Sequence, residues 1–525
     1  MQDSQLDWLQ DSHNAGSIRN GLRGIEKECL RVDRQGLLSR RTHPAALGST
    51  LTHPYLTTDY SEAQLEFVTP PYPTNWETFQ FLCDIHSFVC RNLDDELLWA
   101  PSMPCIVNPS QDLPIAVYGN SNVGRMKSVY REGLGFRYGR AMQAISGVHF
   151  NFSMPAGFWE LYRASENERG NLQSFVSDRY MGLVRNYRRL AWLVIYLFGA
   201  SPALCKSFRP DGHETLAEFD ASTWFGPYST SLRMSDIGYR NKSQSRIKIS
   251  ANSLDEYTAA LGSAITTSSR DYEDIGVRVN GKYRQLNTNL LQIENEYYSS
   301  IRPKPAVGGK EPPTVRLLKG GVDYVEVRTL DLNMHDPVGV NQTQFRFLEA
   351  LLIYCLLTDS PPIDSNEQAE IDARDLIVAR EGRRPGLTFP HGGSSLALRE
   401  RGLAVLENVA VVAEALDADN EGYVGAVDVQ REALVDSDAT PSARLLADMR
   451  DKGLSFVDYG LAATIAHTEY LRSLPLSADK LAFFERTAAE SLQRADEIER
   501  SDDIPFEAFL EAYFGQIKVS RSADL

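Results

Sequence analysis

The chain of 525 residues is long enough for one large domain or for two to three domains of ordinary size. Hydrophobic residues make up 42% of it and charged residues 24%, close to the globular average, which excludes a disordered or fibrous protein. The formal net charge of -16 disfavours nucleic acids and anionic membranes as partners, because an acidic protein repels both polyanions.

The N-terminal residues and the cysteines indicate where the protein works. The first residues, MQDSQLDWLQD, are acidic and contain no apolar core, so no signal or transit peptide is predicted. The most apolar stretch, Leu190 to Cys205, is interrupted by Gly199 and Pro202 and is too short to span a bilayer. The six cysteines lack CxxC and CxxH spacing, which argues against structural zinc and a disulfide framework. A cytoplasmic location is expected.

The secondary-structure pattern changes near residue 335. Before it, short alternating segments bounded by Gly, Pro and Asn are mixed with helical ones, which predicts a sheet-bearing core over residues 1–335. After it, helical periodicity predicts a mainly helical region over residues 336–525, packed on that core as one compact unit. The predicted fold class is α+β. Helices are expected at Trp76–Trp99, Phe175–Phe198, Gln342–Leu357, Glu367–Arg380 and Leu396–Leu416.

Five short segments carry polar residues between apolar neighbours, and in four of them the polar residues are two positions apart, a spacing that places them on one face of a strand. In chain order the polar residues are Glu26 and Glu28, then Asp59 and Glu66, His149 and Asn151, Gln292, Glu294 and Glu296, and finally Glu326 and Arg328. Any one pair would ordinarily be the solvated face of an antiparallel strand, and a lone histidine is more often structural. Five such segments with apolar neighbours, where Lys and Thr usually cover a wet face, favour a shared polar cavity.

Several carboxylates on one sheet face need compensating charge, because like charges repel and desolvation costs several kcal/mol per ion. Divalent cations would supply that charge. Oxygen ligands with a single imidazole and no thiolate favour Mg²⁺ or Mn²⁺ over zinc. Magnesium bound by several acids in turn suggests a nucleoside triphosphate substrate.

Basic residues accompany these acids and suit anionic ligands, since Arg forks match carboxylate and phosphate oxygens in two-point contacts. They are Lys127, Arg131 and Arg137, then Arg233, and finally Arg302 and Lys304. For Arg137 and Lys304, a surface role in neutralising an acidic protein stays open. Arg328 alternates with apolar residues directly after Glu326, which favours a place in the site.

The segment Gly119 to Ser128, GNSNVGRMKS, imitates a phosphate-binding loop. A true loop of this kind needs Lys and then Ser or Thr after its second glycine, where this chain has Arg125 and Met126. A Walker loop is therefore not predicted, since the missing residues would hold phosphate and magnesium.

The segment Asp417 to Asp428, DADNEGYVGAVD, has acidic residues in EF-hand order. It ends in Asp428 where a longer bidentate Glu is usual, and no second such loop accompanies it. An acidic loop that ends a helix is the favoured interpretation, with calcium binding as the alternative.

Long strings of the sequence resemble the proteobacterial glutamate–cysteine ligase family, also called γ-glutamylcysteine synthetase. The strings are GIEKECLRV, HPAALGS, LTTDYSEAQLEFVTP, SMPC, YGNSNVGRMKSVYREGL, RYGRAMQAISGVHFNFSMP, TSLRMSDIGYRNKSQS, LQIENEYYSSIRPK and YVEVRTLDLN. They run from about residue 20 to 335, and EGRRPGL at 381–387 extends the match. Long strings in one order are more specific than any short motif.

The resemblance implies a glutamine-synthetase-like fold, in which a curved antiparallel sheet forms a funnel with metal ions and ATP at its narrow end. One magnesium ion would be bound by Glu28, Asp59 and Glu66, and a second by Glu26, His149 and Glu326. Arg131, Arg233 and Arg328 would contact phosphate and substrate carboxylate, Tyr130, Tyr239 and Tyr298 would line the cysteine pocket, and Gln143 and Asn151 would lie on the nucleotide side. Arg328, Arg131 and Glu326 would be the catalytic residues, and the protein is expected to be a monomer.

The implied reaction is the first step of glutathione biosynthesis. ATP would phosphorylate the γ-carboxylate of L-glutamate, and the amine of L-cysteine would attack the acyl phosphate, with positioning and charge neutralisation supplying most of the catalysis. Three alternatives stay open: a ligase with another amine acceptor, a two-metal phosphatase and a non-catalytic nucleotide-binding regulator.

Overall fold

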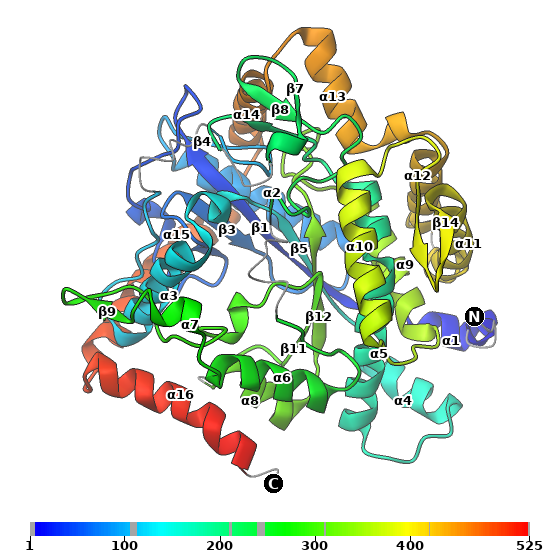
Figure 1. Cartoon of the computed structure of the whole chain (residues 1–525), viewed down its shortest axis with the longest axis horizontal. Coiled ribbons are helices and arrows are strands. Elements are labelled where there is room, and N and C mark those ends of the chain that lie inside the picture. Colours follow the sequence, from blue (N-terminus) through cyan, green and yellow to red (C-terminus); the bar gives the residue numbers. More distant parts are fainter. Residues whose placement is uncertain are drawn as a thin grey trace.

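The computed structural model describes residues 6–105, 113–208, 213–238, 247–308, 311–418 and 420–522. It combines a large antiparallel sheet with many helices (Figure 1), so the α+β prediction is confirmed. Among the described residues, every helix is too short or too polar to traverse a lipid bilayer.

The largest sheet has seven strands within the described part of the chain. Along the sheet their order is β11-β12-β5-β1-β3-β2, with β4 also paired to β1, and every pairing is antiparallel. The strands are β1 (Leu22–Val32), β2 (Leu56–Thr58), β3 (Gln64–Val68), β4 (Leu97–Leu98), β5 (Val148–Ser153), β11 (Ile301–Lys304) and β12 (Tyr324–Leu330). Segments up to 300 residues apart in sequence therefore meet in one sheet.

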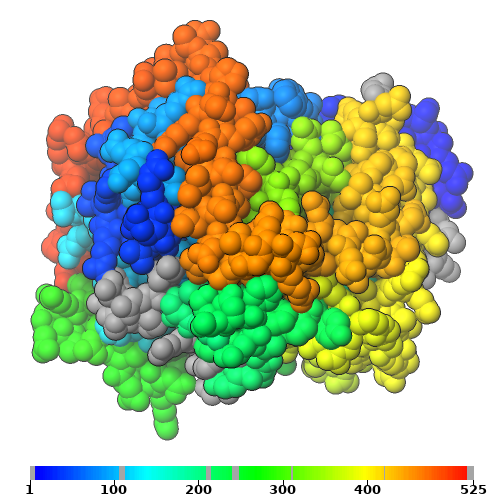
Figure 2. All heavy atoms as spheres, turned by 90° about the horizontal axis from the view of Figure 1, so that it is seen from above, coloured from blue at the N-terminus to red at the C-terminus, as the bar shows by residue number. Residues whose placement is uncertain are grey.

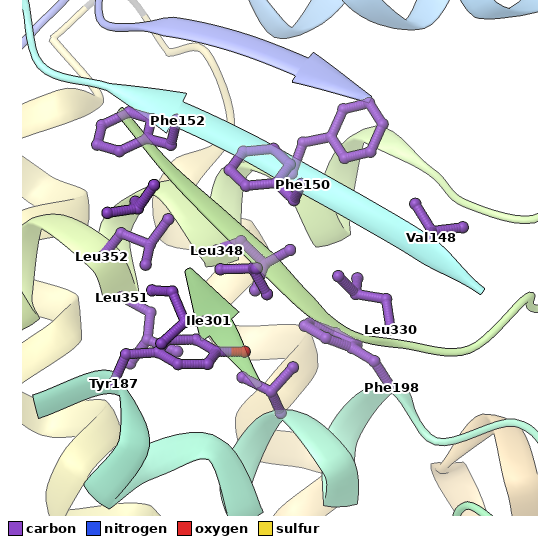
Figure 3. Packing of buried hydrophobic residues seen from close by; sticks show 14 of the residues in the cluster. Val148, Phe150, Phe152, Tyr187, Phe198, Ile301, Leu330, Leu348, Leu351 and Leu352 are labelled. Carbon is purple, nitrogen blue, oxygen red and sulfur yellow. The ribbon is translucent and has the colours of Figure 1, made fainter. Parts of the chain in front are cut away.

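One face of this sheet is apolar and forms the floor of the main core. Helices α2 (Asn75–Arg91) and α5 (Leu172–Phe198) pack on this face, and α9 (Gln342–Leu357) packs beside both helices. The ring of Phe150 lies 5.8 Å from that of Phe345, and Figure 3 shows Leu348 and Leu352 on the side of the sheet where Phe150 and Phe152 lie. This packing leaves the opposite sheet face available for polar side chains.

The remaining helices surround the sheet (Figure 1). They are α1 (Ser12–Ser17), α3 (Asn122–Tyr138), α4 (Ala156–Ser165), α6 (Leu254–Thr266), α7 (Arg270–Glu273), α8 (Pro313–Gly320), α10 (Ser365–Glu381), α11 (Leu398–Leu416), α12 (Tyr423–Val435), α13 (Pro441–Lys452), α14 (Phe456–Ser473), α15 (Ala478–Ser501) and α16 (Phe506–Ser522). The minor strands are β6 (Ala203–Cys205), β7 (Ala217–Glu218), β8 (Thr223–Phe225), β9 (Arg278–Val279), β10 (Lys282–Tyr283), β13 (Thr388–His391) and β14 (Ser394–Ala397).

The predicted helices are all present, with boundaries set by local capping. Helix α9 begins at Gln342, as predicted, because a capping box precedes it. The Asn341 side chain accepts from the backbone N–H of Gln344, and the Gln344 side chain accepts from the backbone N–H of Asn341. Helix α2 ends at Arg91, earlier than the predicted Trp99. Helix α11 begins two residues later than predicted, because residues 394–397 pair with β13 as a hairpin.

The segment from Gln292 to Glu296 was predicted to be a strand, and that prediction is wrong. Glu294 to Glu296 form a single turn of 3-10 helix, in which residues two apart do not share a face. Three polar residues at alternate positions are too short a pattern to separate a strand from such a turn.

A second apolar cluster joins the N-terminal and C-terminal parts of the chain. Figure 2 shows residues of the 200–230 stretch lying against residues of α13 and α14. The backbone N–H of Phe456 donates to the Thr223 hydroxyl at 3.0 Å, and the Phe456 ring lies edge-on to Trp99, with centroids 6.4 Å apart. Helices from beyond residue 335 thus pack directly on the sheet-bearing part.

Candidate active site

The polar face of the large sheet collects acids from three strands, together with a histidine and an asparagine from a fourth. The register places Glu26 of β1 opposite His149 of β5, and Glu28 of β1 opposite Glu66 of β3. Glu326 of β12 lies opposite Asn151 of β5. Because these positions are two residues apart on β1 and β5, their side chains share one face of the sheet. Four of the five polar segments identified in the sequence therefore converge on this face.

His149 lies at the centre of the acids. Its Nδ1 lies 3.1 Å from Glu26 Oε2, and its Nε2 lies 3.6 Å from Glu28 Oε1. The Arg328 guanidinium, which can only donate, lies 3.4 Å from the same Nδ1, so Glu26 and Arg328 compete for this nitrogen. Glu326 Oε1 completes the group at 3.7 Å from Nδ1. Burial lowers the pKa of His149, and a neutral imidazole is a suitable metal ligand.

Three of these residues are close enough to share one ion. Glu26, Glu66 and His149 each offer a ligand atom, and these atoms lie within 4.8 Å of one another. Two further oxygens, Glu326 Oε2 and Asn151 Oδ1, are buried without a hydrogen-bond partner among the described residues. Buried oxygens without partners are costly, and a hard divalent cation would satisfy them. The donor set therefore fits magnesium or manganese.

The carboxylates of this face differ in their electrostatic environment. Burial, together with the nearby Asp59, raises the pKa of Glu28 to about 8. Burial and the surrounding acids also hold the pKa of Glu66 well above its ordinary value. At Glu326, burial is outweighed by Lys304 and Arg328, which hold its pKa well below the ordinary range. Adjacent acids with opposite shifts are typical of functional sites.

Cations lie on the β11 and β12 side of this face. Arg328 donates to Glu326 Oε1 at 3.1 Å, and Lys304 Nζ donates to the same oxygen at 3.2 Å. Lys304 is thus a site residue, and the surface interpretation that the sequence left open does not apply to it. Arg302 lies opposite Glu326 in register and donates to the carbonyl of Asn295 at 3.1 Å.

Helix α3 forms a second wall of the site. Arg131 donates to the backbone carbonyl of Asp59, and its guanidinium lies 3.9 Å from the Asp59 carboxylate. Both Lys127 and Arg131 lie over the ring of Tyr118, at 5.0 and 4.6 Å from its centre. Tyr130, the neighbour of Arg131, lies with its ring 5.9 Å from that guanidinium. Positive charge on α3 therefore faces the acids of the sheet.

Arg233 is fully buried beside the sheet. Its guanidinium donates to the carbonyl of Arg328 at 3.0 Å and lies 3.5 Å from Asp331. A Cβ atom at residue 147 would collide with this guanidinium, which explains the glycine there. The same Gly147 donates its N–H to Glu28 Oε2 at 3.0 Å. Arg233 is therefore fixed in place next to the acid cluster.

Other predicted residues are placed less centrally. Tyr298 donates to the sulfur of Met234 at 3.2 Å, and Met234 is the neighbour of Arg233 in the chain. Gln143 lies on the short 3-10 helix Ala141–Ala144 that precedes β5. Tyr239 lies outside the described residues.

Arg137 and Glu296 are not in this cluster. They form a fully buried ion pair of 2.9 Å, and Tyr138 donates to the same Glu296 oxygen at 2.7 Å. Glu294 accepts from the hydroxyl of Thr314 at 2.8 Å. These acids anchor α3 and α8, so neither the site role nor the surface role expected for Arg137 applies.

Sequence reasoning missed Asp331, which supports Arg233. Alternation from Glu326 and Arg328 assigns residue 331 to the apolar face. The register of β12 against β5 shifts between Val327 and Leu330, which reverses the alternation. Leu330 then joins the apolar core (Figure 3), and Asp331 accepts from Ser201 and from Arg233. A bulge leaves no signal in a short strand, although the string YVEVRTLDLN includes the residue.

The two rejected motifs also have structural explanations. Residues of the GNSNVGRMKS string form the start of α3, where Ser121 caps the helix. Asp417 accepts from the backbone N–H groups of Gly422 and Val424, at 2.7 and 3.1 Å, and so caps the loop between α11 and α12. The predicted loop at the end of a helix is confirmed for these residues, and Asp419 lies outside the described part.

A solved structure is similar to almost the whole chain. It superposes on the crystal structure of a glutamate–cysteine ligase from Francisella tularensis, in complex with AMP, with a TM-score of 0.89. The two sequences are 34% identical, over 95% of this chain and 98% of that one. Fold and site together thus define a ligase built on an acid-lined antiparallel sheet.

Sequence relatives specify the family. The chain is 46% identical to the glutamate–cysteine ligase of Azotobacter vinelandii over 98% of both chains, and 44% identical to that of Pseudomonas putida over 96% of both. The family model for glutamate–cysteine ligase matches residues 6–378. The chain belongs to the glutamate–cysteine ligase family.

Proposed function

We propose that the enzyme joins the γ-carboxylate of L-glutamate to the amine of L-cysteine, in the first step of glutathione biosynthesis. ATP would be converted to ADP and phosphate through a γ-glutamyl phosphate. The observation that carries this proposal is the convergence of Glu26, Glu28, Glu66 and Glu326 around His149 on one sheet face. The names of the relatives, and the AMP bound to the Francisella tularensis ligase, support the substrates and the nucleotide.

Magnesium ions would be held by these acids, and manganese would serve as well. The proposed sets are Glu28, Asp59 and Glu66 for one ion and Glu26, His149 and Glu326 for the other. When bound, the ions would neutralise the polyphosphate and polarise the transferred phosphoryl group. The close group of Glu26, Glu66 and His149 draws on both sets, so the two ions would be near neighbours.

The chain's own cations would stabilise the negative charge of the reaction. In the first step a γ-carboxylate oxygen attacks the γ-phosphorus, and the bond from that phosphorus to ADP breaks. Arg328, which already contacts Glu326, would offset charge on the transferred phosphoryl group. Arg131 would contact a substrate anion from the α3 side, and Arg233 from the opposite side.

In the second step the cysteine nitrogen attacks the acyl carbon, phosphate leaves and the nitrogen loses a proton. Tyr130 and Tyr298 would wall the cysteine pocket, together with Tyr239. Both described tyrosines lie near the proposed arginines: the ring of Tyr130 lies 5.9 Å from the Arg131 guanidinium, and Tyr298 donates to Met234, the neighbour of Arg233 in the chain. Asn151 and Gln143 would lie on the nucleotide side.

The proposal includes the shape and organisation of the molecule. The sheet would form the wall of a glutamine-synthetase-like funnel, with residues 1–335 as the catalytic core and residues 336–525 as its helical cover. Contacts such as Phe456 to Thr223 support one compact catalytic unit. The enzyme would act as a cytoplasmic monomer.

The direct test is ADP release with Mg²⁺, glutamate and one of three amines, namely cysteine, 2-aminobutyrate and glycine, with the product identified by mass spectrometry. The proposal predicts γ-glutamylcysteine, efficient use of 2-aminobutyrate and little turnover with glycine. Comparable turnover with glycine would indicate a ligase with another acceptor. Phosphate release without either amino acid would indicate a phosphatase, and unchanged function in Glu326→Ala and Arg328→Ala variants would indicate a non-catalytic role.

A further inference from the structure

Helix α3 has one side toward the site and another toward the C-terminal end of the chain. Lys127 and Arg131, one helical turn apart, form the site side. Met126 and Val129 lie on the other side and pack into an apolar cluster with residues of α16. Tyr130 lies between the two sides, since it contacts Arg131 and also packs at the edge of that cluster.

The N-terminal end of α3 is held by residues almost 400 positions later. The Asp502 carboxylate accepts from the backbone N–H of Asn122, the first residue of the helix. The Asn122 side chain donates to the carbonyl of Ile504 at 2.9 Å, and Asn120 donates twice to Glu499 at 3.2 Å. A carboxylate at a helix N-terminus also offsets the helix dipole. The end of α3 is therefore fixed by the loop that leads into α16.

Helix α16 then covers the outer side of α3 (Figure 1). Phe506, which is 2% exposed, is buried with Leu510 against Met126 and Leu286. The guanidinium of Arg125 lies 4.3 Å from the centre of the Phe506 ring, in cation-π geometry. Phe506 is thus the largest fully buried contact between the C-terminal helix and α3.

Helix α16 also contacts the segment of residues 283–293, which bonds to the backbone of Tyr130. Tyr283 donates to Glu507 at 2.8 Å, and Ile293 packs against the apolar cluster. The side chain of Gln292 donates to the carbonyl of Tyr130 at 3.2 Å. Tyr130 is therefore positioned from two directions, and both supports depend on α16.

We infer that the C-terminal segment, residues 499–514, is a positioning element for the amine-acceptor side of the active site. Phe506 is its central positioning residue, and it acts through α3 on Tyr130. The inference rests on the proposed function, in which Tyr130 lines the cysteine pocket. The segment lies beyond residue 378, where the match to the family model ends, so the family model does not assign it this role.

The test is steady-state ADP release by the full chain with Phe506→Ala, varying one substrate at a time. We expect the KM for cysteine to rise about tenfold, while kcat and the KM values for glutamate and ATP change less than about twofold, because only binding on the α3 side is loosened. Phe506→Leu should restore most of the cysteine affinity. The matched control is Phe484→Ala, which removes an equally buried ring from α15 that stacks on Phe88, on the far side of the sheet from the site.

Equal changes in all three KM values, or the same cysteine effect in Phe484→Ala, would overturn the inference. If Phe506→Ala does not fold, Asp502→Asn provides the same readout, because it weakens the contact to the start of α3 without opening a cavity. An unchanged KM for cysteine in Asp502→Asn would then overturn it. A wild-type enzyme without cysteine-dependent ADP release would instead refute the proposed function, so the two failures are distinguishable.

Discussion

The two faces of the central sheet come from the same strands and differ in almost every physical respect. On one face Ile25, Phe67, Phe150 and Val325 are fully buried against helices. On the other, Glu26, Glu28, Glu66 and Glu326 project from the same strands and gather around one histidine and a few cations. Folding explains the first face, since burial of apolar area stabilises it. It does not explain the second, where charge is concentrated at a cost to stability.

The largest expected effect is on the apolar face. Phe150→Ala should lower the free energy of unfolding by about 3–5 kcal/mol, because it removes a fully buried ring and leaves a cavity against Phe345. Asn151→Ala, one residue away on the polar face, should cost about 1 kcal/mol. Urea denaturation of both variants measures the difference. Equal losses would contradict the division of the sheet into two faces.

Arg328→Ala should lower kcat with little change in the free energy of unfolding. We expect kcat to fall by about 10²–10³-fold, equivalent to about 2.7–4 kcal/mol, because a contact to developing charge is lost. Its control is Arg23→Ala, an arginine of β1 buried on the opposite face in an ion pair with Glu349. That variant should lose stability strongly but keep the kcat of its folded fraction. An Arg328→Ala enzyme with most of its activity would refute the proposed role.

Magnesium should stabilise the polar face specifically. At a concentration of 100 times its Kd, Mg²⁺ should add about 2.7 kcal/mol to the free energy of unfolding, and EDTA should remove that gain. Glu66→Gln should abolish most of it, whereas Glu160→Gln, at an exposed position on α4, should not. Thermal unfolding with and without Mg²⁺ measures the effect. Full stabilisation of the Glu66→Gln protein would place the ion elsewhere.

A pH dependence is also predicted. Burial and the neighbouring Asp59 raise the pKa of Glu28 to about 8, whereas a glutamate of the unfolded chain titrates near about 4.3. Between these values the metal-free folded state keeps a proton that the unfolded state has lost, so its stability should fall as pH rises through this window. Binding of Mg²⁺ should displace that proton.

The apparent Mg²⁺ affinity should therefore rise by up to about tenfold per pH unit below pH 8, and then level off. Calorimetric titration at pH 6, 7, 8 and 9 measures this slope. Glu28→Gln should bind Mg²⁺ more weakly and show a shallower slope. An affinity that falls with increasing pH would contradict the assignment of Glu28.

Local patterns allowed the site strands to be predicted, because a two-residue period survives around the site residues of β1 and β5 and in β12 as far as Val327. The register that brings Glu26 to His149, and Glu28 to Glu66, depends on pairing between distant segments, which no local pattern specifies. The expectation of one shared site therefore came from the number of such segments and from the family resemblance.

The predictions failed for polar residues that form buried structural ion pairs. Glu296 has the same spacing as a site acid, yet its carboxylate neutralises the buried Arg137. Asp331 was missed because a register shift in β12 reverses the alternation. In both cases the deciding partner lies far away in sequence, so composition and spacing carry no trace of it. Helix α9, which depends on local capping, was predicted to the residue.

The central claim is that these strands direct their acids to divalent ions that hold a nucleoside triphosphate. A crystal structure of the enzyme with Mn²⁺ and a non-hydrolysable ATP analogue, recorded with anomalous scattering, tests it most directly. The account predicts anomalous peaks within about 2.0–2.5 Å of carboxylate oxygens of Glu26, Glu28, Glu66 and Glu326, bridged to the phosphates. Peaks only at other surface acids, with this sheet face free of metal, would contradict it.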